Sequence, residues 1–205
     1  MLVVSLSIFP NIYQEALNSM SYCLAVSGSA GTGKSTLAER LANRLDLPYV
    51  DEGFRRRLEA GLDPHLLSRQ EMRDLILELY REAMNELDDA CEIHGGFVAD
   101  RCSIDYLAFW LHYGFSTEED LTAKLYSKSR QDLNRYDYIV MLPWGVFEIE
   151  DDGRRANNKW LQLKFQSLLE GLAYRLIERQ KIYWVPKEAM DVNDRVNLVF
   201  DWLEK

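Results

Sequence analysis

The sequence predicts an α/β fold in which a parallel sheet is covered by helices on both faces. Short apolar runs of the kind that form buried strands alternate with longer segments whose apolar residues recur at helical spacing. A glycine-rich loop directly follows the first apolar run, at the end of a strand where α/β folds place ligands. The 205 residues, 47% apolar and 28% charged, are enough for one domain with a single core.

The first half of the chain shows this alternation clearly. Leu37, Leu41 and Leu45 recur at helical spacing after the glycine-rich loop, and Gly95 and Gly96 stop a second, longer helix. The expected elements are a strand over 23–26, a helix over 33–45, a strand over 48–50, a helix over 68–93 and a strand over 97–99.

The second half continues the pattern. A helix that starts at Ile104 breaks near Gly114, Pro143 closes a buried strand, and Pro186 ends the last strand. The expected elements are helices over 104–110 and 117–134, a strand over 138–142, a helix over 157–179, a strand over 182–185 and a helix over 192–203.

The N-terminal residues are expected to stand apart from this domain. Residues 1–10 are apolar, but the run is short, has no Lys or Arg before it and lacks a small-residue cleavage site. We therefore expect residues 1–19 to be an appended arm, neither a signal peptide nor a membrane span, and residues 20–205 to form one domain.

The net charge and the cysteines disfavour some classes of binding partner and of structural site. A net charge of −9 argues against a surface that coats nucleic acid, which needs clustered Lys and Arg. Cys23, Cys91 and Cys102 are odd in number and lack C-x-x-C spacing, so neither a disulfide framework nor a zinc site is indicated, and a reducing cytoplasm fits best. The sequence does not decide between a monomer and a homodimer.

The glycine-rich loop matches the phosphate-binding pattern G-x-x-x-x-G-K-[ST]. Its glycines let backbone N–H groups surround phosphates, Lys34 reaches the β and γ oxygens, and the Ser35 hydroxyl can ligate a metal. The sequence therefore predicts binding of ATP with Mg²⁺. The residues expected to contact the nucleotide are Gly28, Ser29, Ala30, Gly31, Thr32, Gly33, Lys34, Ser35 and Thr36.

A second acidic position is expected to complete the metal site. Asp100 directly follows the predicted strand over 97–99, where an enzyme of this kind needs a carboxylate to organise Mg²⁺. Motor-type ATPases commonly follow this Asp with a Glu that prepares water, but here Arg101 follows, which suits an anionic substrate or the transferring phosphoryl group. The pair therefore favours phosphoryl transfer over hydrolysis. The Asn-Lys-x-Asp element of guanine-selective GTPases is missing.

Three segments in order give a resemblance to a known family. They are residues 51–55, which read D-E-G-F-R, residues 100–108, which read D-R-C-S-I-D-Y-L-A, and residues 151–155, which read D-D-G-R-R. Together with the loop, they resemble the P-loop nucleoside and nucleotide kinase superfamily, and most of all its nicotinamide-riboside-kinase-like AAA family. The resemblance implies a five-stranded parallel sheet, a mobile lid after the fourth strand at about residues 144–160, and ATP-dependent phosphorylation of a small metabolite. It also places adenine near the loop over 186–191, with Arg195 beyond.

Candidate catalytic residues follow from the chemistry of phosphoryl transfer, which is mostly positioning and charge stabilisation. Lys34, Arg101 and Arg154 or Arg155 could supply cations around the γ-phosphate, and Glu52 or Asp100 could accept the proton of the acceptor hydroxyl. The sequence does not choose between the two carboxylates.

Residues near these candidates are expected to bind the acceptor or to pack. Arg55 could hold a phosphate or carboxylate of the substrate, and Asp105 and Tyr106 follow Asp100 on a helix where an aromatic ring could stack on a base. The aromatic residues there are more typical of core. We expect no ligand or catalyst among His65, His94 and His112, and a solvated face at Arg56 and Arg57.

Two functions of different classes remain open. The first is an ATP- and Mg²⁺-dependent kinase acting on the hydroxyl or phosphate of a small metabolite, typically a nucleoside or nucleotide. The alternative is a nucleotide-dependent switch or regulatory ATPase acting on a protein partner, which the lack of a Glu after Asp100 disfavours. A polynucleotide kinase is less favoured, because the chain is acidic and such an enzyme needs a basic channel.

Overall fold

The computed structural model describes residues 21–147 and 158–204. Five parallel strands form one sheet in the order β2-β3-β1-β4-β5, which confirms the predicted fold class. The expected N-terminal arm lies outside the described residues. The strands are β1 (Cys23–Ser27), β2 (Tyr49–Val50), β3 (Phe97–Asp100), β4 (Tyr138–Met141) and β5 (Ile182–Trp184).

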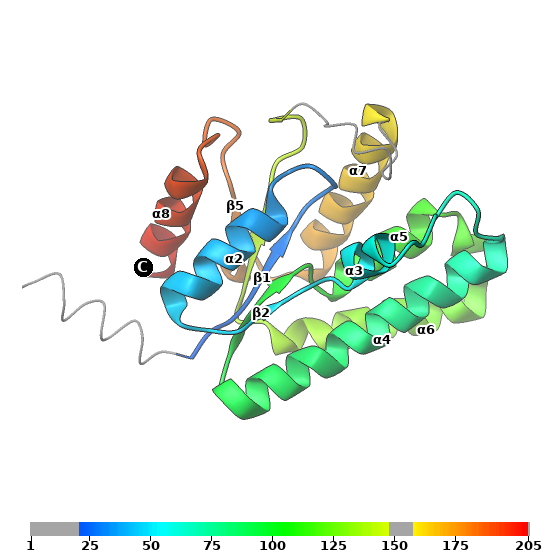
Figure 1. Ribbon diagram of the computed structural model, residues 1–205, viewed down its shortest axis with the longest axis horizontal. Helices are drawn as coiled ribbons and strands as arrows, with labels where there is room; N and C mark the ends of the chain where they lie inside the picture. Colours follow the sequence, from blue (N-terminus) through cyan, green and yellow to red (C-terminus); the bar gives the residue numbers. More distant parts are fainter. Residues whose placement is uncertain (1–20, 148–157, 205) are drawn as a thin grey trace, which may run out of the picture.

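Helices cover both faces of the sheet, as Figure 1 shows. On one face, α2 and α8 pack against it, and on the other face α4, α5 and α7 do so, with α6 packed against α5. The helices are α2 (Lys34–Leu45), α3 (Phe54–Glu59), α4 (Arg69–His94), α5 (Ser103–His112), α6 (Glu119–Asp132), α7 (Lys159–Leu176) and α8 (Val192–Leu203).

The central strand β1 is buried on both sides, and its residues alternate between two cores. Leu24 and Val26 join the core under α2 and α8, whereas Ala25 between them joins the core under α4, α5 and α7. This follows from the two-residue period of a strand. A strand with apolar side chains on both faces reads as a continuous apolar run, which is why the sequence revealed it.

The structure departs from the predicted elements at two places. The short helix α3 was not predicted, because its six residues are too few to show a helical period. Helix α7 ends at Leu176 and not at Arg179, because Ile177 adopts an extended conformation and a 3₁₀ turn over Arg179–Lys181 follows. Elsewhere the predicted boundaries differ by a few residues only.

Of the two arginines of α3 that were expected on a solvated face, Arg56 is exposed and Arg57 is half-buried. Arg57 pairs with Glu78 and Glu82 of α4, whereas Arg56 pairs with Asp51 and Glu86. The ion pairs tie α3 to the long helix α4. Pairs as exposed as these contribute about 0–1 kcal/mol each, so they orient α3 more than they stabilise it.

Within the described residues, no helix is long and apolar enough to cross a membrane.

Helix α4 is defined at both ends by local signals. Ser68 and Glu71 form a reciprocal capping box at its start, and Gly95 ends it in the left-handed conformation with a φ of 77°. The next residue, Gly96, lies against the backbone of Tyr22, just before β1. A Cβ added at Gly96 would lie 2.5 Å from the carbonyl oxygen of Tyr22, so only glycine fits there.

We expect Gly96→Ala to destabilise the protein by about 1–3 kcal/mol, because backbone must move to admit the methyl group. Gly171→Ala is the matched control: it lies inside α7, where the new Cβ meets only the end of the Arg175 side chain, and it should leave stability unchanged or raise it by up to about 1 kcal/mol. Urea unfolding measures both. Equal stability of the two variants would contradict this packing.

Candidate active site

The candidate site lies at the carboxyl ends of three neighbouring strands. The glycine-rich loop follows β1, Asp100 is the last residue of β3, and Glu52 follows β2. Because β3 lies between β2 and β1 in the sheet, the strand order brings these residues together. This is the edge at which open α/β sheets bind ligands.

The loop between β1 and α2 has the geometry of an anion-binding site. Gly33 has a φ of 87° and directly precedes Lys34, the first residue of α2. The N–H groups in the first turn of a helix have no partner within that helix, and the helix dipole favours negative charge there. The loop and the start of α2 can therefore hold phosphate.

The side chain of Lys34, at the start of α2, turns back onto this loop. It is buried, and its Nζ donates a hydrogen bond to the carbonyl oxygen of Ser29 at 2.9 Å. Burial and then the charge of Arg101 lower the pKa of Lys34 to about 8, although nearby carboxylates oppose the shift. A nearby anion would favour the charged form, so this group is suited to phosphate.

Ser35 and Asp100 form a pair of oxygen donors. The Ser35 hydroxyl donates to Oδ2 of Asp100 and accepts a hydrogen bond of 2.8 Å from Nη2 of Arg55. Oδ1 of Asp100 is buried without a hydrogen-bond partner among the described residues. Burial, the largest effect, raises the pKa of Asp100, and a cation at its free oxygen would reverse this. A carboxylate and a hydroxyl are ligands that Mg²⁺ accepts, so the residues present fit this metal.

Arg101 is the centre of a buried ion cluster. Its Nε donates to Glu52, and its Nη1 donates to Asp105 at 3.0 Å and to the carbonyl oxygen of Gly28 at 3.3 Å. Burial alone would lower the pKa of Arg101, but Glu52 and Asp105 outweigh it and raise that pKa. The guanidinium also lies 4.7 Å from the ring centre of Phe109. Arg101 therefore fixes the end of β3 to both the loop and the segment after β2.

Asp105 and Tyr106, which were expected to contact substrate, both lie in the interior of the structure. Asp105 is fully buried, and its Oδ2 accepts hydrogen bonds from the Ser27 hydroxyl at 2.6 Å and the Cys102 N–H at 3.0 Å. Its other oxygen, Oδ1, accepts the hydrogen bond from Arg101 and so holds the guanidinium in place. Tyr106 is buried in a narrow apolar pocket, where its ring packs edge-on against Tyr80.

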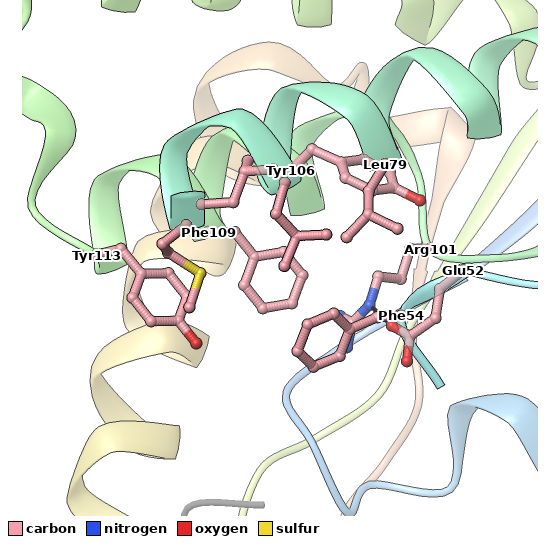
Figure 2. A pocket seen from close by; sticks show the side chains of 10 residues that line it. Glu52, Phe54, Leu79, Arg101, Tyr106, Phe109 and Tyr113 are labelled. Atoms are coloured by element: carbon pink, nitrogen blue, oxygen red, sulfur yellow. Dashed lines mark hydrogen bonds and ion pairs between the residues drawn. The ribbon is translucent and has the colours of Figure 1, made fainter. Parts of the chain in front are cut away.

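A cavity of about 300 Å³ opens beside Lys34 and Ser35, and aromatic rings form part of its lining. Figure 2 shows the adjoining narrow pocket, with the Arg101–Glu52 pair at one end and Tyr113 at the other. A flat ring of a ligand could stack in such a cavity. The aromatic walls of the larger cavity are Phe54, Phe109, Tyr113 and Phe165.

Two of the histidines, for which no catalytic or ligand role was expected, lie at this cavity. His65 and His112 both line it. Burial and then the charge of Lys164 lower the pKa of His112, which favours its neutral imidazole. This placement could not be predicted from the sequence, because His65 lies in a loop and the orientation of α5 depends on its packing.

Sequence reasoning also missed the role of Gln166, and it mentioned Arg195 only for its place in the chain. Both side chains are buried and form hydrogen bonds with the glycine-rich loop. Arg195 could have been noticed as a charge on the apolar face of the predicted last helix, whereas Gln166 carries no comparable signal. Arg154 and Arg155, expected in the lid, lie outside the described residues, as does most of the lid itself.

A family model described as an AAA domain matches residues 23–185. Cytidylate kinase from Geobacillus thermodenitrificans (strain NG80-2) is 45% identical over 49 residues, which is 21% of this chain and 22% of that protein. The chain thus spans less than a quarter of this curated relative.

Solved structures share the fold at low sequence identity. The NadR protein in complex with NR has a TM-score of 0.65 and 22% identity, covering 93% of this chain and 53% of that one. Deoxyadenosine kinase from M. mycoides, with the products dCMP and a flexible dCDP bound, has a TM-score of 0.61 and 12% identity, covering 88% and 98%. At these identities the likeness shows the fold.

We expect Arg101→Met to destabilise the protein by about 3–5 kcal/mol, because it leaves two buried carboxylates without their cation. Adding Glu52→Gln to this variant should restore at least about 1 kcal/mol, since one of those charges is then removed. Urea unfolding of the single and double variants measures both effects. If the single variant is as stable as the wild type, the ion cluster does not hold these segments together.

Proposed function

This chain belongs to the AAA domain family, and from that premise we propose that it is an ATP- and Mg²⁺-dependent kinase that phosphorylates a nucleoside. The observation that carries the proposal is that the Glu52–Arg101 pair lines the same cavity as residues of the phosphate-binding loop. One wall of that cavity is formed by Lys34 and Ser35 of the nucleotide site. The γ-phosphate of ATP and the hydroxyl of an acceptor in the cavity would therefore lie next to each other.

The nucleotide side of this proposal uses the loop and the start of α2. The N–H groups there would bind the phosphates, and Lys34 would contact the β and γ oxygens. Ser35 and Asp100 would hold Mg²⁺, which when bound would neutralise charge on the phosphates. Arg154 and Arg155 remain proposed as lid residues that close over the nucleotide.

Glu52 is the proposed base for the acceptor hydroxyl. It lines the cavity, whereas Asp100 receives the Ser35 hydroxyl in the proposed metal site. A carboxylate within reach of the hydroxyl can accept its proton as the phosphoryl group arrives. Arg101 would orient Glu52 and stabilise charge that develops nearby.

The charges around the cavity support a nucleoside as the acceptor over a nucleotide. Among the described residues that line it, the arginine and lysine side chains are Lys34, which the ATP phosphates would engage, and Arg101, which already pairs with Glu52 and Asp105. The phosphate of a nucleotide acceptor would find neither cation free. A neutral ribose with an aromatic base suits the same walls without that cost.

The alternative of a switch ATPase has less support. Hydrolysis needs a group that orients water next to the γ-phosphate, and the residue after Asp100 is an arginine that is buried in ion pairs. The cavity beside the phosphate site also has room for a small-molecule acceptor, whereas hydrolysis needs room for a water molecule only.

The direct test supplies Mg·ATP with single nucleosides, pyridine ribosides and the matching 5′-monophosphates, and follows ADP and new phosphorylated products by mass spectrometry. We expect a nucleoside to be phosphorylated with a kcat/KM at least about tenfold above that of its monophosphate, a difference of about 1.4 kcal/mol. Lys34→Met should lower kcat at least about 100-fold, because a cation at the phosphates is lost. ADP formed at one slow rate in every mixture would support the switch ATPase.

A further prediction concerns protons. With a pKa of about 8, Lys34 is largely neutral at pH 8.5 in the free protein, and bound phosphate would restore its charge. We therefore expect binding of Mg·ADP to take up a proton at pH 8.5, and its affinity to fall as the pH rises through 8. Calorimetry in two buffers of different ionisation enthalpy measures the uptake. Lys34→Met should show none, and the same uptake in that variant would exclude Lys34 as its source.

A further inference from the structure

Ser29 is the residue of the glycine-rich loop on which several side chains converge. Its carbonyl oxygen accepts hydrogen bonds from Lys34 Nζ and Thr32 Oγ1, both at 2.9 Å. Its N–H donates to Oε1 of Gln166 at 2.8 Å. The first two contacts are internal to the loop and α2, but the third comes from a helix far along the chain.

Gln166 is held so that its amide oxygen faces this N–H. The side chain lies in α7 and is 2% exposed. Its Nε2 donates to the carbonyl oxygen of Leu142, just after β4, at 3.0 Å and to Glu170 at 2.8 Å. Turning the amide over would leave a buried N–H facing a nitrogen and two acceptors facing an oxygen, so the three contacts fix one orientation.

Arg195 holds the same loop from the opposite side. It lies in α8 and is 2% exposed, and its Nη1 donates to the carbonyl oxygen of Thr32 at 2.7 Å. Its Nε donates to the carbonyl oxygen of Ala189 at 2.7 Å, and the guanidinium lies 4.8 Å from the ring centre of Phe147.

The positive charge of Arg195 is unbalanced in the described part of the chain. No carboxylate there forms an ion pair with it, and its Nη2 is buried without a partner among those residues. A buried cation without a counterion is costly unless a ligand or its charge compensates. Here the buried charge lies against the loop that would receive phosphates.

We propose that Gln166 and Arg195 are positioning residues that hold the glycine-rich loop in its nucleotide-binding shape, and that the charge of Arg195 adds to the affinity for nucleotide phosphates. The inference rests on the proposed function, because the loop must bind a nucleotide. Ordering a loop costs conformational entropy. If side chains already order the loop in the free protein, this cost does not reduce the affinity for the nucleotide. Gln166 thereby also joins the loop to α7, whose Gln162 and Phe165 line the cavity of about 300 Å³.

The experiment compares Gln166→Met and Arg195→Met with wild type, using calorimetry with Mg·ADP as the probe of the loop. Each variant should raise the Kd for Mg·ADP about tenfold. The KM for the preferred nucleoside of the panel above, measured at saturating ATP, should stay within about twofold, since neither side chain touches the acceptor. Gln180→Met and Arg175→Met, on exposed side chains away from the loop, are the matched controls and should bind Mg·ADP as the wild type does.

If the methionine variants do not fold, a second pair of more conservative variants tests the same inference. Gln166→Asn and Arg195→Lys keep the polarity or charge but not the reach or the fork of donors, and they should show the same selective loss of Mg·ADP affinity. Wild-type affinity in a folded variant, or equal losses for nucleotide and nucleoside, would overturn the inference. Failure of the wild type itself to bind Mg·ADP would instead overturn the proposed function.

Discussion

A buried guanidinium needs carboxylates around it, and Arg101 gathers them from separate parts of the chain. Glu52 comes from the segment after β2 and Asp105 from α5, while the carbonyl oxygen of Gly28 comes from the start of the loop. The cluster fixes the relative positions of the cavity and the phosphate loop. The position of the guanidinium also depends on the backbone, because Arg101 has a φ of 89°, which residues other than glycine rarely adopt.

This arrangement distributes charge in a way that suits phosphoryl transfer. Arg101 is neutralised by its carboxylates, Lys34 is buried with a lowered pKa, and Asp100 has one oxygen without a partner among the described residues. A bound nucleotide would bring negative charge to Lys34, and its metal ion would bring positive charge to that oxygen of Asp100. Aromatic rings line part of the cavity beside them, and a flat ring of an acceptor could stack there.

Much of this could be predicted from the sequence, because the signals are local. Buried strands appear as apolar runs, α4 is marked by its period and end signals, and the loop is recognised by spacing alone. What could not be predicted depends on tertiary packing. Asp105 lies in the first turn of α5 and Arg101 lies just before that helix, and only the packing of α5 against the sheet buries their ion pair. The contact from Gln166 crosses 137 positions of the chain and leaves no pattern in it.

The measurement that tests the central claim most directly is the fate of the γ-phosphate, followed by ³¹P nuclear magnetic resonance with Mg·ATP, the wild-type protein and a mixture of nucleosides. If the chain is a kinase, a phosphomonoester signal should grow in step with ADP while inorganic phosphate stays at the level of the protein-free control. Inorganic phosphate that grows in step with ADP, without any phosphomonoester, would contradict the account and identify a hydrolase.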